Sequence, residues 1–174
     1  MTPMKKPAIN INTIRFGLSE YTDFCSHIIE VNLNHCLYTT FMNYFLAKTD
    51  PDTYSLADFQ KEGTTLWDGV HNNAAMLFIQ KMRPGDLVYI YESLSTKAIV
   101  GLAEVIGEPF LNTADPRRSW ATTLKFVKKY TTPLPLAAVK ADPALADFAL
   151  VKQSRLSVMP VPTNLQKHID SLLT

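Results

Sequence analysis

Short runs of apolar residues recur along the chain and are separated by polar segments rich in Gly, Pro, Asn and Asp. Five of these runs are rich in β-branched and aromatic residues or alternate with a period of two, which is typical of strands. They cover residues 42–48, 87–93, 98–106, 120–130 and 156–161. The sequence therefore predicts five short strands between residues 42 and 161.

The run at 120–130, "WATTLKFVKKY", shows the alternation most clearly. A two-residue period places Trp120, Leu124 and Phe126 on one face of the predicted strand. The same period places Lys125 and Lys129 on the opposite face. We therefore expect an apolar face turned to the core and a basic face turned to solvent.

Two helices are expected in the middle of the chain. Ser55 is suited to cap a short helix with Asp58 as its capping-box partner, and Gly63 is suited to end it. Apolar residues spaced as i, i+4, i+7, i+8 and i+12 predict a second helix over residues 70–82. The following "RPGD" has Pro84 and Gly85 in the order that a type II turn requires.

A terminal helix is expected after residue 162, where Thr163 and Gln166 have the spacing of a capping box. Strands and helices do not alternate regularly, which favours an α+β fold over a doubly wound parallel sheet. We expect a small mixed or antiparallel β-barrel with peripheral helices. No apolar run approaches the length of a membrane span, so we expect no membrane partner.

Residues 1–41 show neither a strand nor a helix pattern, and the compact domain is expected to cover 42–174. We interpret 1–41 as an N-terminal extension, either poorly ordered or a product of an upstream start codon. The chain's two cysteines, Cys25 and Cys36, both lie there beside His27 and His35. Their spacing is not that of a usual zinc finger, so we expect no metal. The rest of the chain has no cysteine and so no disulfide framework, and we therefore expect a reducing, intracellular setting.

Charge is distributed unevenly, although the whole chain is nearly neutral. Residues 42–115 contain five Lys and Arg against ten Asp and Glu, whereas residues 116–174 contain nine against three. Such asymmetry favours a basic patch for a polyanion, although ordinary solvated faces would also account for it. The candidate phosphate contacts are Arg117, Arg118, Lys125, Lys128 and Lys129.

The stretch "TTLWDGVHNN" concentrates residue types that bind flat ligands. Asp68 and Gly69 ahead of the predicted helix resemble a capped helix start, which would hold Trp67 on a rigid loop. An indole beside backbone donors suits a heteroaromatic ring that stacks while its edge is hydrogen-bonded. The alternative is that Trp67 only fills the core.

Catalytic alternatives also start from this stretch. Asp68, His71 and a serine, whether Ser93, Ser154 or Ser157, supply the residue types of a hydrolase triad. No nucleophile elbow accompanies them. Phosphate-binding glycine loops are absent as well, because the six glycines are scattered. We expect no cofactor.

Taken in order, several motifs resemble the EVE domain of the thymocyte nuclear protein group. They include "MNYFLAKTDPDTYS", "GTTLWDGVHNN", "MRPGDLVYIYES", "AIVGLAEVI" and "RLSVMPV", and the resemblance covers about residues 42–173. It implies a PUA-like fold whose pocket accepts a flipped, modified base without catalysis. The residues it places at that pocket are Lys48, Thr49, Pro51, Trp67, Asp68, Gly69, Val70, Asn72, Tyr91, Ser93, Arg155, Leu156 and Ser157.

The chain departs from the family pattern at three places. The usual Tyr-Trp is Tyr44-Phe45, the usual Arg-Asn-Tyr-Gln is His71-Asn72-Asn73-Ala74, and the common Tyr-His-Ser is Tyr91-Glu92-Ser93. These changes remove a phosphate-binding arginine and a stacking tyrosine and add an acid that would repel phosphate if it faced the ligand. The preferred modified base is therefore expected to differ.

We expect a non-enzymatic module that binds DNA or RNA through a modified, methylated or hydroxymethylated cytosine-type base. An ASCH-like enzyme acting on a modified nucleoside is the alternative, with Lys48 beside Thr49 and Asp50 performing acyl transfer. A structural partner protein with a vestigial pocket is another. A cytoplasmic protein is expected, or a nuclear one in a eukaryote. A monomer is assumed, although the sequence leaves the oligomeric state open.

Overall fold

Seven strands form one mixed sheet in the computed structural model, which describes residues 42–173. Six of them follow the order β2-β6-β4-β3-β1-β7, and β5 pairs with β6 off this path. The strands are β1 (Tyr44–Thr49), β2 (Thr64–Trp67), β3 (Leu87–Glu92), β4 (Ala98–Val105), β5 (Phe110–Leu111), β6 (Trp120–Pro135) and β7 (Val158–Val161). The predicted extension 1–41 and its cysteine and histidine cluster lie outside the described residues.

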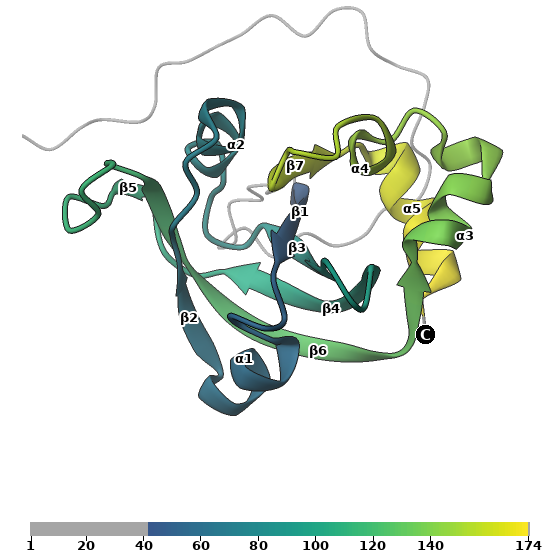
Figure 1. The fold of residues 1–174 in the computed structure, drawn as a ribbon, viewed down its shortest axis with the longest axis horizontal. Coiled ribbons are helices and arrows are strands. Elements are labelled where there is room, and N and C mark those ends of the chain that lie inside the picture. Colours follow the sequence, from purple (N-terminus) through teal and green to yellow (C-terminus); the bar gives the residue numbers. More distant parts are fainter. Residues whose placement is uncertain (1–41, 174) are drawn as a thin grey trace, which may run out of the picture. The chain divides into compact units, whose positions relative to one another are not determined.

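The sixteen-residue strand β6 shapes the sheet, because it pairs with three other strands along its length. Its first part pairs with β5 and β2 and its longer remainder pairs with β4, all in antiparallel orientation. β1 pairs in parallel with β3 and in antiparallel orientation with β7. Figure 1 shows β6 sweeping around the other strands, so that the sheet curls into an open barrel. The expected α+β fold with a mixed, partly closed barrel is confirmed.

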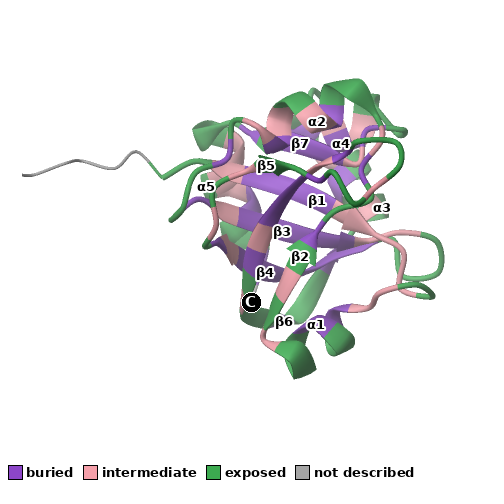
Figure 2. Ribbon diagram, turned by 90° about the vertical axis from the view of Figure 1, so that its left-hand side faces the viewer, coloured by how far each residue is buried: buried purple, intermediate pink, exposed green. Residues whose placement is uncertain are grey.

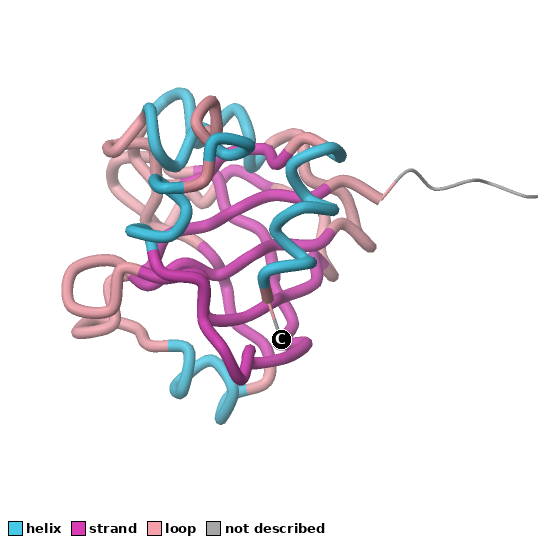
Figure 3. The backbone as a smooth tube through the Cα atoms, turned by 90° about the vertical axis from the view of Figure 1, so that its right-hand side faces the viewer, coloured by secondary structure: helices cyan, strands magenta, loops and turns pink. Residues whose placement is uncertain are grey.

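Helices surround this sheet (Figure 3). They are α1 (Leu56–Glu62), α2 (Asn73–Ile79), α3 (Leu136–Ala141), the 3-10 helix η1 (Pro143–Leu145), α4 (Ala149–Lys152) and α5 (Thr163–Leu172). The strands carry most of the buried residues, as Figure 2 shows. Each peripheral helix therefore adds only the residues of its apolar side to the hydrophobic core.

Both faces of the sheet are covered. On one face, Phe59 of α1 meets Phe126 of β6 edge to face, with ring centroids 5.8 Å apart. On the other face, the Tyr89 hydroxyl donates to Asp170 of α5. Burial, together with this carboxylate, raises the pKa of Tyr89 far above its usual value. Because both faces are covered, β3 reads as a nearly continuous apolar run, "LVYIYE".

The predicted start and end of α1 are confirmed, and so is the predicted type II turn before β3. Ser55 caps α1 and forms a capping box with Asp58, and Gly63 ends the helix. Gly85 has φ +94, and the Asp86 amide donates to the Arg83 carbonyl at 3.0 Å, as in a type II turn.

The helix predicted over 70–82 is shorter in the structure and begins later. α2 spans Asn73–Ile79, and its N-cap is Asn72, whose side chain accepts from the Ala75 amide at 3.1 Å. The prediction that Asp68 and Gly69 start the helix was therefore wrong. Val70 and Met82 are buried although they lie outside the helix, which is why the apolar spacing overestimated its length.

Two further predictions were wrong at single residues. α5 begins after Pro162 without a side-chain cap, and the Gln166 side chain instead hydrogen-bonds with Asp170. In β6, an irregularity leaves Val127 unpaired between the Phe126 and Lys128 positions of the register. This extra residue reverses the alternation, so Lys125 shares its face with Lys128 and not with Lys129.

Candidate functional site

A cavity of about 580 Å³ opens where β1 ends beside β2. The loop after β2, the turn after β1 and Ser157 ahead of β7 complete its wall. Its lining residues are Lys48, Thr49, Asp50, Thr53, Tyr54, Thr65, Leu66, Trp67, Asp68, Gly69, Val70, His71 and Ser157. We call it the Trp67 pocket. Seven of the thirteen predicted site residues are brought together in this wall.

Trp67 is the last residue of β2 and lies opposite Thr122 of β6. Its side chain is only 8% exposed, yet it borders the pocket, so it serves both the core and the cavity wall. Gly69 has φ +69, a conformation that strains other residues, and it turns the chain away after Asp68.

Asp68 is held in the pocket wall by a contact from a distant loop. The Asn112 side-chain amide donates to Asp68 Oδ2 at 3.2 Å, and Asn112 is itself buried. This bond engages one carboxylate oxygen of Asp68 and leaves the other as an acceptor. The pocket therefore offers a fixed negative group close to the indole.

Lys48 supplies a positive group at the end of β1. Its ammonium donates to the Ser154 carbonyl at 3.0 Å, and its backbone amide donates to the Ser157 carbonyl at 2.8 Å. Burial lowers the pKa of Lys48 below its usual value. The Tyr91 ring lies beneath the ammonium, 6.0 Å from its centroid. Lys48 thus joins β1 to the segment before β7.

Two of the remaining predicted residues, Tyr91 and Ser93, contact residues of the wall from outside the cavity. Tyr91 is buried, and the Ser93 hydroxyl donates to the Thr49 carbonyl at 2.7 Å. Pro51 lies in the turn after β1 but does not line the cavity. The acid at Glu92 accepts from the Leu56 amide at 2.9 Å, so this carboxylate stabilises the start of α1.

The other three predicted residues, Asn72, Arg155 and Leu156, line a separate, shallow cavity of about 320 Å³. Lys152 and Ser154 also border it. Asn72 uses its side-chain oxygen to cap α2, so that atom is engaged. Asn72 therefore does not line the Trp67 pocket, where the family resemblance placed it.

The five predicted phosphate contacts divide into two groups, and none lines the Trp67 pocket. The β6 register places Lys125 and Lys128 on the face opposite to Trp67. Lys129 lies farther along β6, opposite Gly101. Arg117 and Arg118 lie instead in loop 112–119 between β5 and β6, the loop that supplies Asn112.

This loop also contacts His71, a pocket residue that the list of predicted site residues omitted. His71 Nε2 donates to Asp115 Oδ2 at 2.7 Å. The pKa of Asp115 lies well below its usual range, because the nearby Ser119 hydroxyl, the Arg117 amide and His71 stabilise the charged carboxylate. The Ser119 hydroxyl itself makes no hydrogen bond of ordinary geometry. His71 therefore pairs with Asp115, and the Asp68–His71 pair of the hydrolase alternative does not form.

The groups considered for acyl transfer are engaged in structural bonds. The Thr49 hydroxyl donates to the Tyr54 carbonyl at 2.6 Å, and the Lys48 ammonium donates to Ser154. Among residues 42–173, His, Cys, Asp and Glu form no cluster of three that could hold a metal ion. Likewise, no helix in that range is long and apolar enough to cross a membrane.

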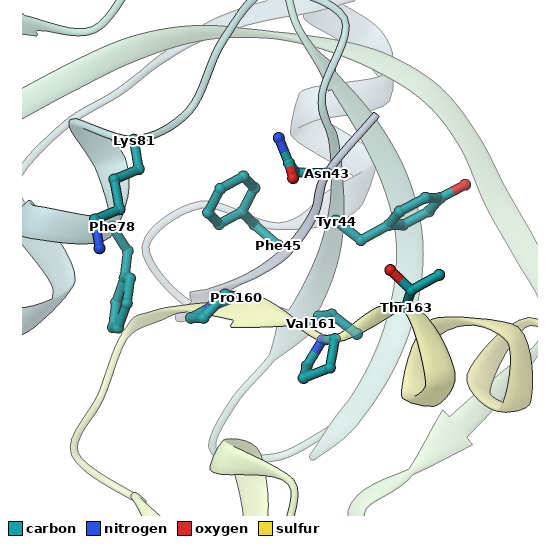
Figure 4. A pocket seen from close by; sticks show the side chains of 9 residues that line it. Asn43, Tyr44, Phe45, Phe78, Lys81, Pro160, Val161 and Thr163 are labelled. Carbon is teal, nitrogen blue, oxygen red and sulfur yellow. The ribbon is translucent and has the colours of Figure 1, made fainter. Parts of the chain in front are cut away.

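A second cavity, of about 360 Å³, lies between β1, β7, α2 and the start of α5 (Figure 4). We call it the Phe78 cavity. Its wall combines aromatic, aliphatic and proline side chains with the polar residues Asn43, Lys81 and Thr163. None of the predicted site residues lines it.

Sequence reasoning missed half of the Trp67 pocket wall. Thr65 lies two residues before Trp67 on β2 and therefore on the same face, but "TTLW" was not identified as a strand. Thr53 and Tyr54 lie within the motif "MNYFLAKTDPDTYS", but the prediction did not assign them to the pocket. Nothing in the sequence indicated that Asn112 and Asp115 contact residues 44 positions away.

Known proteins share this architecture. Thymocyte nuclear protein 1 of Mus musculus is 26% identical over 168 residues, which cover 76% of this chain and 73% of the mouse protein. The NMR structure of a Rhodopseudomonas palustris protein is 39% identical, with a TM-score of 0.71, over 75% of this chain and 92% of that one. Human THYN1 in complex with 5-methylcytosine-containing DNA is 22% identical, with a TM-score of 0.68, over 75% of this chain and 96% of that one.

The last likeness shows the fold, which is the expected PUA-like one. A family model described as EVE domain matches residues 43–172. This range contains every element of the sheet and all the residues of the Trp67 pocket. The chain therefore belongs to the EVE domain family.

Proposed function

We propose that the protein binds nucleic acid by accepting a modified, cytosine-type base in the Trp67 pocket, without catalysing a reaction. The observation that carries this proposal is the pocket itself. An indole, a carboxylate, an ammonium and hydroxyl groups surround about 580 Å³, a volume within the usual range of ligand sites. A flat base can stack on the indole while polar groups contact its edge.

The polar groups favour a base with an exocyclic amino group. The free carboxylate oxygen of Asp68 is an acceptor, and carboxylates accept from the N4 amino group of cytosine. The Lys48 ammonium and the Ser157 hydroxyl are donors suited to the carbonyl and ring nitrogen of the same base. Lys48 has three N–H groups, of which one donates to Ser154.

Family membership supports the same proposal. Human THYN1, which has this fold, is seen in a complex with DNA that contains 5-methylcytosine. The engagement of Lys48 and Thr49 in structural hydrogen bonds supports a binding role over acyl transfer. A binding role therefore fits the residues of the Trp67 pocket better than a catalytic role.

Tryptophan fluorescence tests the proposal, because the chain contains only Trp67 and Trp120. We expect single-stranded oligonucleotides with one 5-methylcytosine or 5-hydroxymethylcytosine to quench the emission more strongly than the cytosine or thymine oligonucleotide. A Trp120→Phe variant isolates the Trp67 signal and should keep the quenching. Equal responses to all oligonucleotides, or quenching that disappears in Trp120→Phe, would contradict the proposal.

A further inference from the structure

Loop 112–119 is an ordered connection between β5 and β6. The Asn112 amide donates to the Ser119 carbonyl at 2.8 Å, which closes the loop. Inside it, the Arg118 amide donates to the Asp115 carbonyl at 2.8 Å, and the Arg117 amide donates to Asp115 Oδ1 at 2.9 Å. Arg118 has φ +54, a backbone conformation uncommon for a residue with a side chain. These bonds fix the backbone conformation of the loop, and with it the positions from which the side chains of both arginines extend.

Two side-chain hydrogen bonds fasten this loop to the wall of the Trp67 pocket. Asn112 donates to Asp68 at 3.2 Å, and His71 donates to Asp115 at 2.7 Å. Asp68 and His71 both line the pocket, and they stand on either side of Gly69 and Val70. The loop is therefore attached at two points to the segment that follows Trp67.

The charges of the loop favour an anion at this place. Arg117 and Arg118 are exposed and take part in no salt bridge among residues 42–173. Asp115, the acid of the loop, is already engaged by His71 and by the Arg117 amide. Both arginines therefore extend from a loop that is attached to the pocket wall, and guanidinium groups bind phosphate with bidentate geometry.

We propose that loop 112–119 is the part of the protein that binds the phosphodiester backbone next to the bound base. Arg117 and Arg118 contact the phosphates, and His71 and Asp115 are positioning residues that hold the loop at the pocket. Lys125 and Lys128 of β6 have no part in this contact, because they lie on the opposite face of the sheet. The inference rests on the proposed base-binding function.

The test compares a ligand with and without phosphates. The nucleoside 5-methyl-2′-deoxycytidine and a short oligonucleotide containing it are titrated against the full chain and against the double variant Arg117→Ala/Arg118→Ala. We expect the oligonucleotide affinity to fall about tenfold at low salt and the slope of log K against log salt to shrink by about 1.4. The affinity for the nucleoside should not change.

Lys125→Ala/Lys128→Ala is the matched control, because it removes the same charge from the other face of the sheet. We expect its salt slope and affinity to equal those of the unmodified protein. An equal loss in both double variants would overturn the inference by showing a general charge effect. Nucleoside binding combined with an unchanged Arg117→Ala/Arg118→Ala variant would also overturn it, whereas absence of nucleoside binding would refute the proposed function itself.

The positioning role of Asp115 is tested by a double-mutant cycle. Asp115→Ala should weaken oligonucleotide binding and leave nucleoside binding intact. In the Arg117→Ala/Arg118→Ala background the same substitution should have no further effect, because there are no arginines left to position. Additive losses would show that Asp115 acts in another way and would contradict its positioning role.

Discussion

The Trp67 pocket and the Phe78 cavity differ in what their walls offer a ligand. The Trp67 pocket contains Lys48, Asp68 and several hydroxyl groups beside its indole. The Phe78 cavity is lined by Tyr44, Phe45, Phe78, Val161 and proline side chains, with Asn43, Lys81 and Thr163 as its other polar residues. Both have the volume of a small-molecule site, so volume does not separate them.

What separates them is their charged groups. In the Trp67 pocket, Asp68 accepts from Asn112, Lys48 donates to the Ser154 carbonyl and His71 donates to Asp115, whereas Lys81 is the charged residue of the Phe78 cavity wall. Groups fixed in this way lose little freedom when a ligand binds. We infer that the Trp67 pocket is the preorganised site, and the following predictions test this difference.

Substitution of Trp67 should have the largest effect. Stacking of one base on an aromatic side chain contributes about 1–3 kcal/mol, so Trp67→Ala should weaken binding of the modified oligonucleotide by roughly 5- to 150-fold. Isothermal titration calorimetry measures this without relying on tryptophan emission. The same measurement on Phe78→Ala, in the other cavity, should give unchanged affinity.

Trp67 also fills the core, so stability must be measured beside binding. A buried tryptophan replaced by alanine costs about 3–5 kcal/mol of unfolding free energy. Trp67→Phe keeps an aromatic ring and should unfold close to the original temperature while binding less tightly. If Phe78→Ala lost as much affinity as Trp67→Ala, the ligand would bind in the Phe78 cavity and the prediction would be wrong.

Asp68→Asn should alter the choice of base more than the strength of binding. A correct hydrogen-bonded pair contributes about 1–3 kcal/mol of discrimination against the wrong base. The amide of asparagine can donate, so the preference for a base with an amino group over one with a carbonyl should shrink by about tenfold or more. Competition between 5-methylcytosine and thymine oligonucleotides measures this ratio, and an unchanged ratio would remove Asp68 from base recognition.

Lys48→Met should weaken binding about tenfold, because hydrogen bonds to charged groups contribute about 1.5–3 kcal/mol. Stability should change by less than about 1 kcal/mol, because burial already disfavours the ammonium, as the lowered pKa of Lys48 shows. Calorimetric titration and thermal unfolding separate the two effects. A large loss of stability with unchanged affinity would make Lys48 a structural residue only.

Local chemistry determined how much could be predicted from the sequence. Ser55, Asp58 and Gly63 were assigned correctly because a capping box and a glycine stop act within one helix. The face of Lys129 was wrong because the bulge in β6 depends on its pairing with β4. The family motifs cover every residue that lines the Trp67 pocket, but a motif does not show which of its side chains face a cavity.

Asn112 shows the limit most clearly. Its neighbours in sequence give no sign of a partner, and its contact with Asp68 exists only because β5 folds back beside β6. The Phe78 cavity has the same origin, since its wall combines residues from β1, α2 and β7. Such contacts follow from the tertiary fold and cannot be read from spacing along the chain.

The acid pH dependence of loop 112–119 should give the smallest effect and tests how the Trp67 pocket is held. The pKa of Asp115 is lower in the folded protein than its unfolded value of 3.8. The charged carboxylate therefore stabilises the fold fully above pH 3.8, and this contribution is lost as the pH falls toward the lower folded pKa. Asp115→Asn should melt at a lower temperature than the unmodified protein at pH 7 and pH 5.

That difference in melting temperature should shrink below pH 3.8. Lys81→Gln at the Phe78 cavity serves as the control, because it removes a charge without touching the loop, and its difference from the unmodified protein should not shrink in the same range. Calorimetry at stepped pH measures both. A gap for Asp115→Asn that grew on acidification would mean that the neutral acid, and not the carboxylate, is the form that holds the loop against the pocket.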